Sequence, residues 1–206
     1  MRIFVVGNGP SLLQQVSLLH RLACEHTFAC NRFARWGEAP FRPTYYACSA
    51  GAVLKGVEPP TPPFQKQRFI VSRRRDELER FPDWTQVYKK EWHPVLLPGA
   101  QELLVKGGAT QVGIMAQLSA WLGYTQIYLL GTELAEIDPQ HPGGHVFDQN
   151  GREMPFFYND GWDHLAGVWR EIAAGLGQHG VTISDCTPNG RLAQVLGHVS
   201  LEEAMA

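Results

Sequence analysis

The stretch IFVVGNGPSLL, residues 3–13, changes its pattern abruptly at two glycines. Its first part, Ile3 to Val6, is a continuous apolar run rich in β-branched and aromatic residues, which is typical of a strand covered on both faces in a parallel sheet. Apolar residues then recur at helical spacing with polar residues between them: Leu12, Leu13, Val16, Leu19 and Leu22. A strand, a tight turn and a helix form the first half of a βαβ unit.

The turn itself has features of an anion-binding site. Gly7 and Gly9 permit backbone angles that other residues resist, and Pro10 suits the first helical position. Unpaired N–H groups at the helix start favour a phosphate or carboxylate, so we expect Gly7, Asn8, Gly9 and Ser11 to contact a ligand. The turn lacks the spacing of the dinucleotide fingerprint G-x-G-x-x-G. A plain turn with Ser11 as helix cap is the alternative, but ligands bind where parallel strands end, which favours binding.

Further apolar runs predict strands at 27–30, 44–48, 68–71, 127–131 and 181–184. The proline-rich segment EPPTPP at 58–63 is interpreted as a surface connection, because proline lacks the amide donor that a central strand needs. Residues 81–106 show no period of 2 or 3.6 long enough to assign. The order of the elements predicts an α/β fold with a mostly parallel sheet.

Three later helices are also expected. An apolar stripe of Val112, Met115, Leu118 and Leu122 predicts a helix that Gly123 closes. A second helix is predicted at about 162–176. In SLEEAM, residues 200–205, Ser200 and Glu203 have the spacing of a capping box.

A long segment at about 135–161 is rich in Pro, Gly, Asp and Asn, and we interpret it as a lid inserted into a single domain of residues 1–206. His141 and His145 lie in it at a spacing of four. The intervening Pro142-Gly143-Gly144 excludes the helix that would align them on a metal, so we predict no metal site. His145 is a candidate general base or acid, and His164, where the next helix begins, is its competitor.

Polar residues at predicted strand and helix ends complete the candidate site. Asn31 follows the second strand and could contact a ribose, base or phosphate, or cap a local turn. Thr110 and Gln111 precede a helix and could bind the ligand or cap that helix. Glu133 follows the strand IYLLG and either faces the ligand or is a solvated charge. Arg73-Arg74-Arg75 are followed by acidic residues, so a solvated helix start is favoured over phosphate binding.

Composition limits the class of protein. The 206 residues and 23.0 kDa suit one sizeable core, and the formal charge of −2 provides no basic field for nucleic acid or anionic membranes. The four cysteines show no CxxC spacing and indicate a reducing compartment. No apolar run is long enough for a signal peptide or membrane span, so we expect a soluble, cytoplasmic protein. The sequence leaves the oligomeric state open, and a homo-oligomer is possible.

The chain resembles known proteins in the order of its short motifs. GNGPSL at 7–12, CNRF at 30–33, IYLLGTEL at 127–134 and TPNGRL at 187–192 resemble, in this order, the bacterial sialyltransferases of glycosyltransferase family 42. PTYYAC, KGGAT, GHVFD and SLEEAM make the chain look closer still to the DUF115 group, which is similar to archaeal 6-hydroxymethylpterin diphosphokinase.

The resemblance implies a Rossmann-like fold with helices on both faces of the sheet and a lid. It places a nucleotide across Asn8, Gly9, Ser11, Asn31 and Thr110. Glu133 stands where the family has an acidic residue, and the family's catalytic His falls on Asp163, one residue before His164. Gly108 and Gln111 replace an Arg and a Ser of the sialyltransferases, so specificity for a CMP-linked sugar is not carried over.

We therefore expect a glycosyltransferase of surface polysaccharide or glycoconjugate synthesis. It would use a nucleotide sugar and an unidentified acceptor, with no required cofactor. The amides of residues 8–11 would hold the phosphate, and His164 or His145 would accept the acceptor's proton. One alternative is an ATP-dependent diphosphokinase with Mg²⁺ held by Glu133 and lid aspartates. The other is a non-catalytic nucleotide-binding protein.

Overall fold

The computed structural model describes residues 1–36, 39–56, 64–90, 93–107, 110–133 and 162–206. Within them, eight strands form one sheet in the order β6-β5-β4-β3-β2-β1-β7-β8, and every neighbouring pair is parallel. The strands are β1 (Arg2–Val6), β2 (Thr27–Cys30), β3 (Tyr45–Ser49), β4 (Gln67–Ser72), β5 (Thr85–Lys90), β6 (Leu104–Lys106), β7 (Gln126–Leu130) and β8 (Thr182–Asp185).

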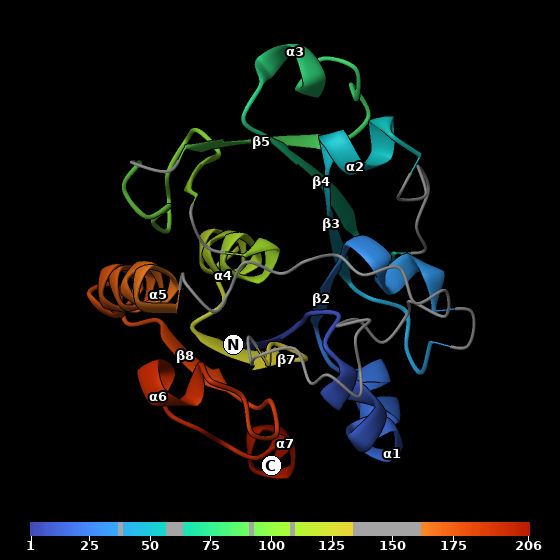
Figure 1. The fold of residues 1–206 in the computed structure, drawn as a ribbon, viewed down its shortest axis with the longest axis vertical. Helices are drawn as coiled ribbons and strands as arrows, with labels where there is room; N and C mark the ends of the chain where they lie inside the picture. Colours follow the sequence, from blue (N-terminus) through green and yellow to red (C-terminus); the bar gives the residue numbers. More distant parts are fainter. Residues whose placement is uncertain (37–38, 57–63, 91–92, 108–109, 134–161) are drawn as a thin grey trace.

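Helices cover both faces of this sheet (Figure 1). One face carries α4 (Gln111–Trp121), α5 (Trp162–Gly177) and α6 (Ala193–Leu196). The opposite face carries the 3₁₀ helices η1 (Pro10–Gln15), η2 (His20–Cys24) and η3 (Asn31–Arg35), together with α1 (Val16–Leu19), α2 (Ala50–Leu54), α3 (Arg75–Leu78) and α7 (Leu201–Met205). The predicted Rossmann-like α/β fold is confirmed. The predicted lid at about 135–161 lies outside the described residues.

The position of β1 in the middle of the sheet explains why its residues are apolar without alternation. Ile3 and Val5 belong to the core on the α4 side, whereas Phe4 and Val6 belong to the core on the opposite side. All four residues are fully buried. Because successive side chains of a strand point to opposite faces, a strand covered on both faces needs apolar residues at every position.

Two helix predictions need correction. The segment after β1 is three short helices, η1, α1 and η2, because apolar residues three or four apart suit a 3₁₀ helix as well as an α-helix. Its Leu13 is 58% exposed and does not join the core. The helix α4 has no apolar stripe, because every residue from Val112 to Ala120 is buried.

The region that showed no clear period contains β5 and β6, and the side chain of Gln117 on α4 secures it. The Gln117 side chain is fully buried, and its Oε1 accepts the backbone N–H groups of Leu96 and Lys106, both at 3.0 Å. Its Nε2 donates to the carbonyls of Lys106 and Gly113, both at 3.1 Å. One α4 amide therefore satisfies backbone groups that the irregular sequence around β6 leaves unpaired.

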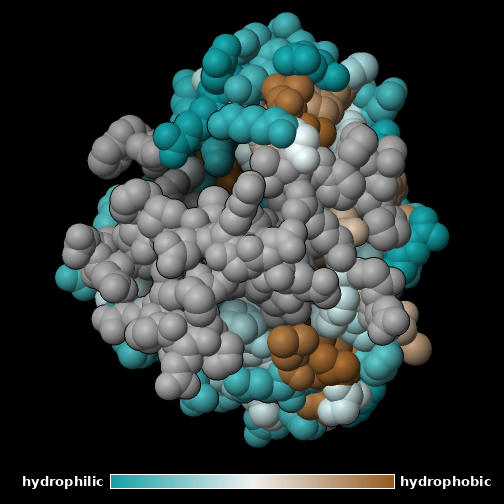
Figure 2. Space-filling model, turned by 45° about the vertical axis from the view of Figure 1, so that its right-hand side comes forward, coloured by the Kyte–Doolittle hydropathy of each residue, from teal (hydrophilic) through white to brown (hydrophobic). Residues whose placement is uncertain are grey.

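On the face shown in Figure 2, the described surface is mostly hydrophilic, and hydrophobic residues reach it in separate patches. Of the described helices, none is both long and apolar enough to cross a membrane.

Candidate functional site

The candidate site lies where the direction of chain progression reverses in the sheet. From β1 the chain builds outward through β2 to β6, and it then returns to add β7 and β8 on the other side of β1. Val6 is in register with Leu130 of β7 and with Ala29 of β2, so Gly7, Gly131 and Cys30 follow at the same edge. In open parallel sheets, ligands bind in the crevice outside such a switch point.

The two glycines of the turn are explained by close approach of the segment after β7. The Gly7 N–H donates to the Leu130 carbonyl at 2.7 Å, and a Cβ at Gly7 would lie 2.4 Å from the Gly131 carbonyl oxygen. A Cβ at Gly9 would lie 1.4 Å from Oε2 of Glu133. Neither glycine has a positive φ, so our expectation of unusual backbone angles was wrong, and space is what requires glycine here.

The carboxylate of Glu133 occupies the position where we expected an external anion. Its Oε1 accepts the N–H of Ser11 at 2.5 Å. The N–H of Gly9 donates to the Gly131 carbonyl at 2.9 Å. Within the segment 8–11, the expectation of free N–H groups was therefore wrong for Gly9 and Ser11, because the segment after β7 supplies acceptors that the local sequence does not reveal. Pro10 begins η1, as predicted.

Three buried oxygens at this edge have no hydrogen-bond partner within the described residues: Asn8 Oδ1, Ser11 Oγ and Asn31 Oδ1. The side chains of Asn8 and Asn31 follow adjacent strands, and Nδ2 of Asn8 donates to Sγ of Cys30 at 3.7 Å. Asn31 has a φ of 46°, and its carbonyl accepts the hydroxyl of Tyr46. Buried polar atoms normally have partners, so this cluster indicates a place for an external hydrogen-bonding group.

Thr110 and Gln111 begin α4 at the same edge of the sheet, because α4 starts soon after the carboxyl end of β6. Thr110 occupies the N-cap position, but its side chain makes no capping hydrogen bond. Nε2 of Gln111 is buried and lacks a partner among the described residues. The capping alternative is wrong for Thr110, and also for Ser11, since Gly9 is the N-cap of η1.

A buried network that the sequence did not lead us to predict supports the segment after β7. Oδ1 of the fully buried Asp185 accepts the Thr187 N–H at 3.0 Å and the Thr132 hydroxyl at 3.3 Å. The Thr132 N–H in turn donates to Oγ1 of Thr187 at 3.1 Å. Burial raises the pKa of Asp185, and these hydrogen bonds oppose the rise. The sequence signal for this network was Asp185, a carboxylate directly after the predicted strand VTIS at 181–184.

Of the two candidate bases, the structure describes one. His164 is exposed in the first turn of α5, and His145 lies outside the described residues. Their roles stay predictions. Over the described ranges, no group of three or more His, Cys, Asp or Glu residues is placed to hold a metal, and the lid aspartates of the Mg²⁺ alternative fall in 134–161.

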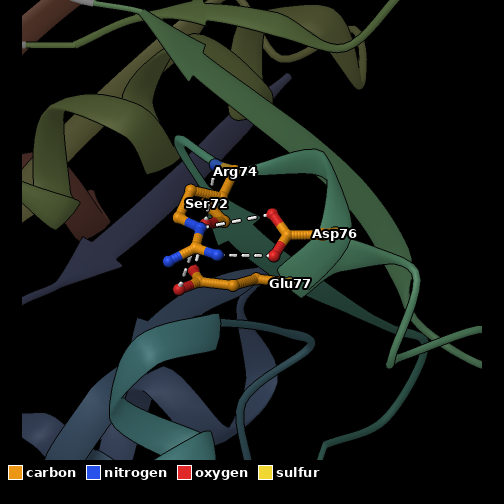
Figure 3. Close-up of polar contacts among 4 residues, drawn as sticks. All are labelled: Ser72, Arg74, Asp76 and Glu77. Atoms are coloured by element: carbon orange, nitrogen blue, oxygen red, sulfur yellow. Dashed lines mark hydrogen bonds and ion pairs between the residues drawn. The ribbon is translucent and has the colours of Figure 1, made fainter.

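The arginine run after β4 forms local contacts (Figure 3). Nη2 of Arg74 lies 2.6 Å from Oδ2 of Asp76, and this ion pair lowers the pKa of Asp76. The Ser72 hydroxyl donates to Glu77 at 2.5 Å and accepts the Arg74 N–H at 3.1 Å. These contacts agree with the interpretation of this segment as a solvated helix start.

Comparison with known proteins finds the same fold in a sialyltransferase. The structure of the sialyltransferase CST-II in complex with trisaccharide acceptor and CMP aligns with a TM-score of 0.54 at 15% identity, over 98% of this chain and 88% of that chain. The Campylobacter jejuni CstII structure with cytidine-5′-monophosphate aligns more weakly, with a TM-score of 0.46 at 14% identity, over 96% and 84%. No protein-family model and no curated protein sequence matches the chain. At these identities the likeness is one of fold.

Proposed function

We propose that this protein is a glycosyltransferase that uses a nucleotide sugar, with the nucleotide bound at the carboxyl ends of β1, β2 and β7. The observation that carries the proposal is the pair of unmatched buried oxygens, Asn8 Oδ1 and Asn31 Oδ1, at the switch point of the sheet. The shared fold supports the class, since the aligned CST-II structure holds CMP and an acceptor trisaccharide.

The proposed reaction transfers a sugar from the nucleotide to an acceptor hydroxyl. The acceptor oxygen bonds to the anomeric carbon, the bond from that carbon to the phosphate oxygen breaks, and His164 or His145 accepts the hydroxyl proton. Asn8, Ser11, Asn31, Thr110 and Gln111 would bind the nucleotide through hydrogen bonds. No step requires a metal.

Thermal unfolding in the presence of nucleotides and nucleotide sugars tests the binding step. A nucleotide at about 100 times its Kd is expected to raise the melting temperature by about 5–10 °C. Asn8→Asp places a carboxylate on this buried side chain in place of the amide that donates to Cys30, and it is expected to abolish this shift. Gln126→Glu makes the same chemical change at the amino end of β7 and is expected to preserve it. A wild-type protein that no nucleotide stabilises would contradict the proposal.

Turnover separates catalysis from binding. We compare the variants His164→Ala and His145→Ala. The variant that removes the general base is expected to lose about 10²- to 10⁴-fold in the rate of hydrolysis or transfer of a nucleotide sugar, and to keep its affinity for the nucleotide. Magnesium-dependent release of AMP from ATP would instead indicate a diphosphokinase. Binding without turnover across a panel of nucleotide sugars would indicate a non-catalytic protein.

A further inference from the structure

We propose that Glu133 determines which part of the ligand binds at the turn after β1: it accepts a hydroxyl or amino group of the nucleoside and keeps the phosphate away from the Ser11 amide. The inference rests on the proposed function and deepens it. It reverses the expected role of the turn, which the sequence alone predicts to hold a phosphate.

The first reason is that the turn already contains an anion. Oε1 of Glu133 accepts the Ser11 N–H at 2.5 Å, and Oε2 lies so close to Gly9 that a Cβ there would be 1.4 Å away. Among the described residues, no Lys, Arg or His forms an ion pair with this carboxylate. A phosphate on the same N–H would therefore meet a like charge within a few ångströms.

The second reason is the chemistry of the neighbouring unmatched atoms. Asn8 and Ser11 are only 9% and 3% exposed, and both Asn8 Oδ1 and Asn31 Oδ1 are acceptors without a donor in the described residues. A phosphate offers further acceptors and would leave these oxygens unsatisfied, which is costly for buried groups. A sugar diol or an amino group offers the donors that these oxygens and Oε2 of Glu133 lack within the described residues.

The third reason is that the backbone of Glu133 is fixed on both sides. The N–H of Arg191 donates to the Glu133 carbonyl at 3.0 Å, and the preceding Thr132 is tied to Thr187 and Asp185. Oε2 of Glu133 accepts no hydrogen bond from the described residues. Within the described residues, the anchored carboxylate thus has one oxygen without a donor.

The test compares the affinities of a nucleoside and its 5′-monophosphate, such as cytidine and CMP, by calorimetry. In Glu133→Gln the side chain keeps its shape and its Ser11 contact. It loses its negative charge, and an N–H donor replaces Oε2. We expect nucleoside binding to weaken about tenfold and monophosphate binding to hold or strengthen, so that the ratio of the two Kd values shifts at least about tenfold toward the monophosphate.

Two further variants keep the test decisive. Glu203→Gln changes a carboxylate whose hydrogen bonds within the described residues are to Ser200, at the start of α7, and it is expected to leave the ratio unchanged. Gly9→Ala displaces the Glu133 carboxylate without removing it, and it should shift the ratio in the same direction as Glu133→Gln. An unchanged ratio, or a shift toward the nucleoside, in both site variants would overturn the proposed role of Glu133 but not the proposed function. A wild-type protein that binds neither ligand would overturn the proposed function itself.

Discussion

Gly7 and Gly9 lie two residues apart in one turn, yet different atoms make each of them necessary. The atom nearest to a Cβ at Gly7 is the backbone oxygen of Gly131, whereas at Gly9 it is the terminal carboxylate of Glu133. A backbone atom directly after the paired strand β7 cannot move without disturbing the sheet, but a side-chain terminus can rotate away. The two positions therefore differ in how an added methyl group is accommodated.

We expect Gly7→Ala to lower the free energy of unfolding by about 3 kcal/mol or more, because the new methyl group overpacks against backbone. Gly9→Ala should cost only about 1–2 kcal/mol, the value of the Ser11 to Glu133 hydrogen bond that it breaks. Urea unfolding measures both. In a Glu133→Ala background the cost of Gly9→Ala should nearly vanish, as a double-mutant cycle would show. Equal costs at the two glycines would contradict this interpretation.

Among the elements, α7 is a helix whose start is fixed by its own sequence. The Ser200 hydroxyl accepts the Glu203 N–H at 3.2 Å, and Oε2 of Glu203 accepts the Ser200 N–H at 2.9 Å. This is the predicted capping box. The hydrogen bonds from Ser200 lower the pKa of Glu203 below its usual 4.5.

Ser200→Ala is expected to lower the free energy of unfolding by about 1 kcal/mol at pH 7. Because the pKa of Glu203 is lowered on folding, its contribution is present above pH 4.5 and is lost as the pH falls through the folded-state pKa. The cost of Ser200→Ala should therefore shrink in acid, as urea unfolding at several pH values would reveal. Ser17→Ala, at an exposed position of α1, is the matched control. A cost that does not depend on pH would exclude the ionised form as the capping partner.

On the scale of the whole molecule, Arg2 joins the two ends of the chain. Its Nη2 lies 2.7 Å from Oε1 of Glu25, the residue that follows η2. The same guanidinium donates to the carbonyls of Ala204 at 2.8 Å and Met205 at 3.1 Å, at the end of α7. The first strand thereby holds the last helix against the sheet.

We expect Arg2→Ala to lower the free energy of unfolding by about 1–3 kcal/mol, because the terminal carbonyls of α7 lose a charged donor. Hydrogen exchange of residues 201–206 should accelerate more than exchange in β7 or β8. Arg21→Ala removes an exposed arginine of η2 and should change stability by less than about 0.5 kcal/mol. Uniform acceleration throughout the sheet would mean that Arg2 does not act on α7 specifically.

The sequence predicted the strands that are covered on both faces and missed those at one edge. Runs such as TFAC at 27–30 coincide with β2, because full burial requires apolar residues at every position. The edge strand β6 has only three residues, and its neighbour β5 mixes exposed and buried positions, so neither has a distinctive pattern. Their positions depend on contacts with residues later in the chain, such as the hydrogen bonds between the Gln117 side chain and the backbone of Leu96 and Lys106.

Local sequence determined what neighbouring residues can determine: the buried strands, the start of η1 at Pro10, the end of α4 before Gly123 and the capping box of α7. It also located the polar residues that follow the strands. Tertiary structure alone decided what those residues meet, because Ser11 and its carboxylate partner Glu133 are 122 residues apart in the chain. A helix start attracts an anion, and only the pairing of β1 with β7 places a carboxylate of the protein itself there.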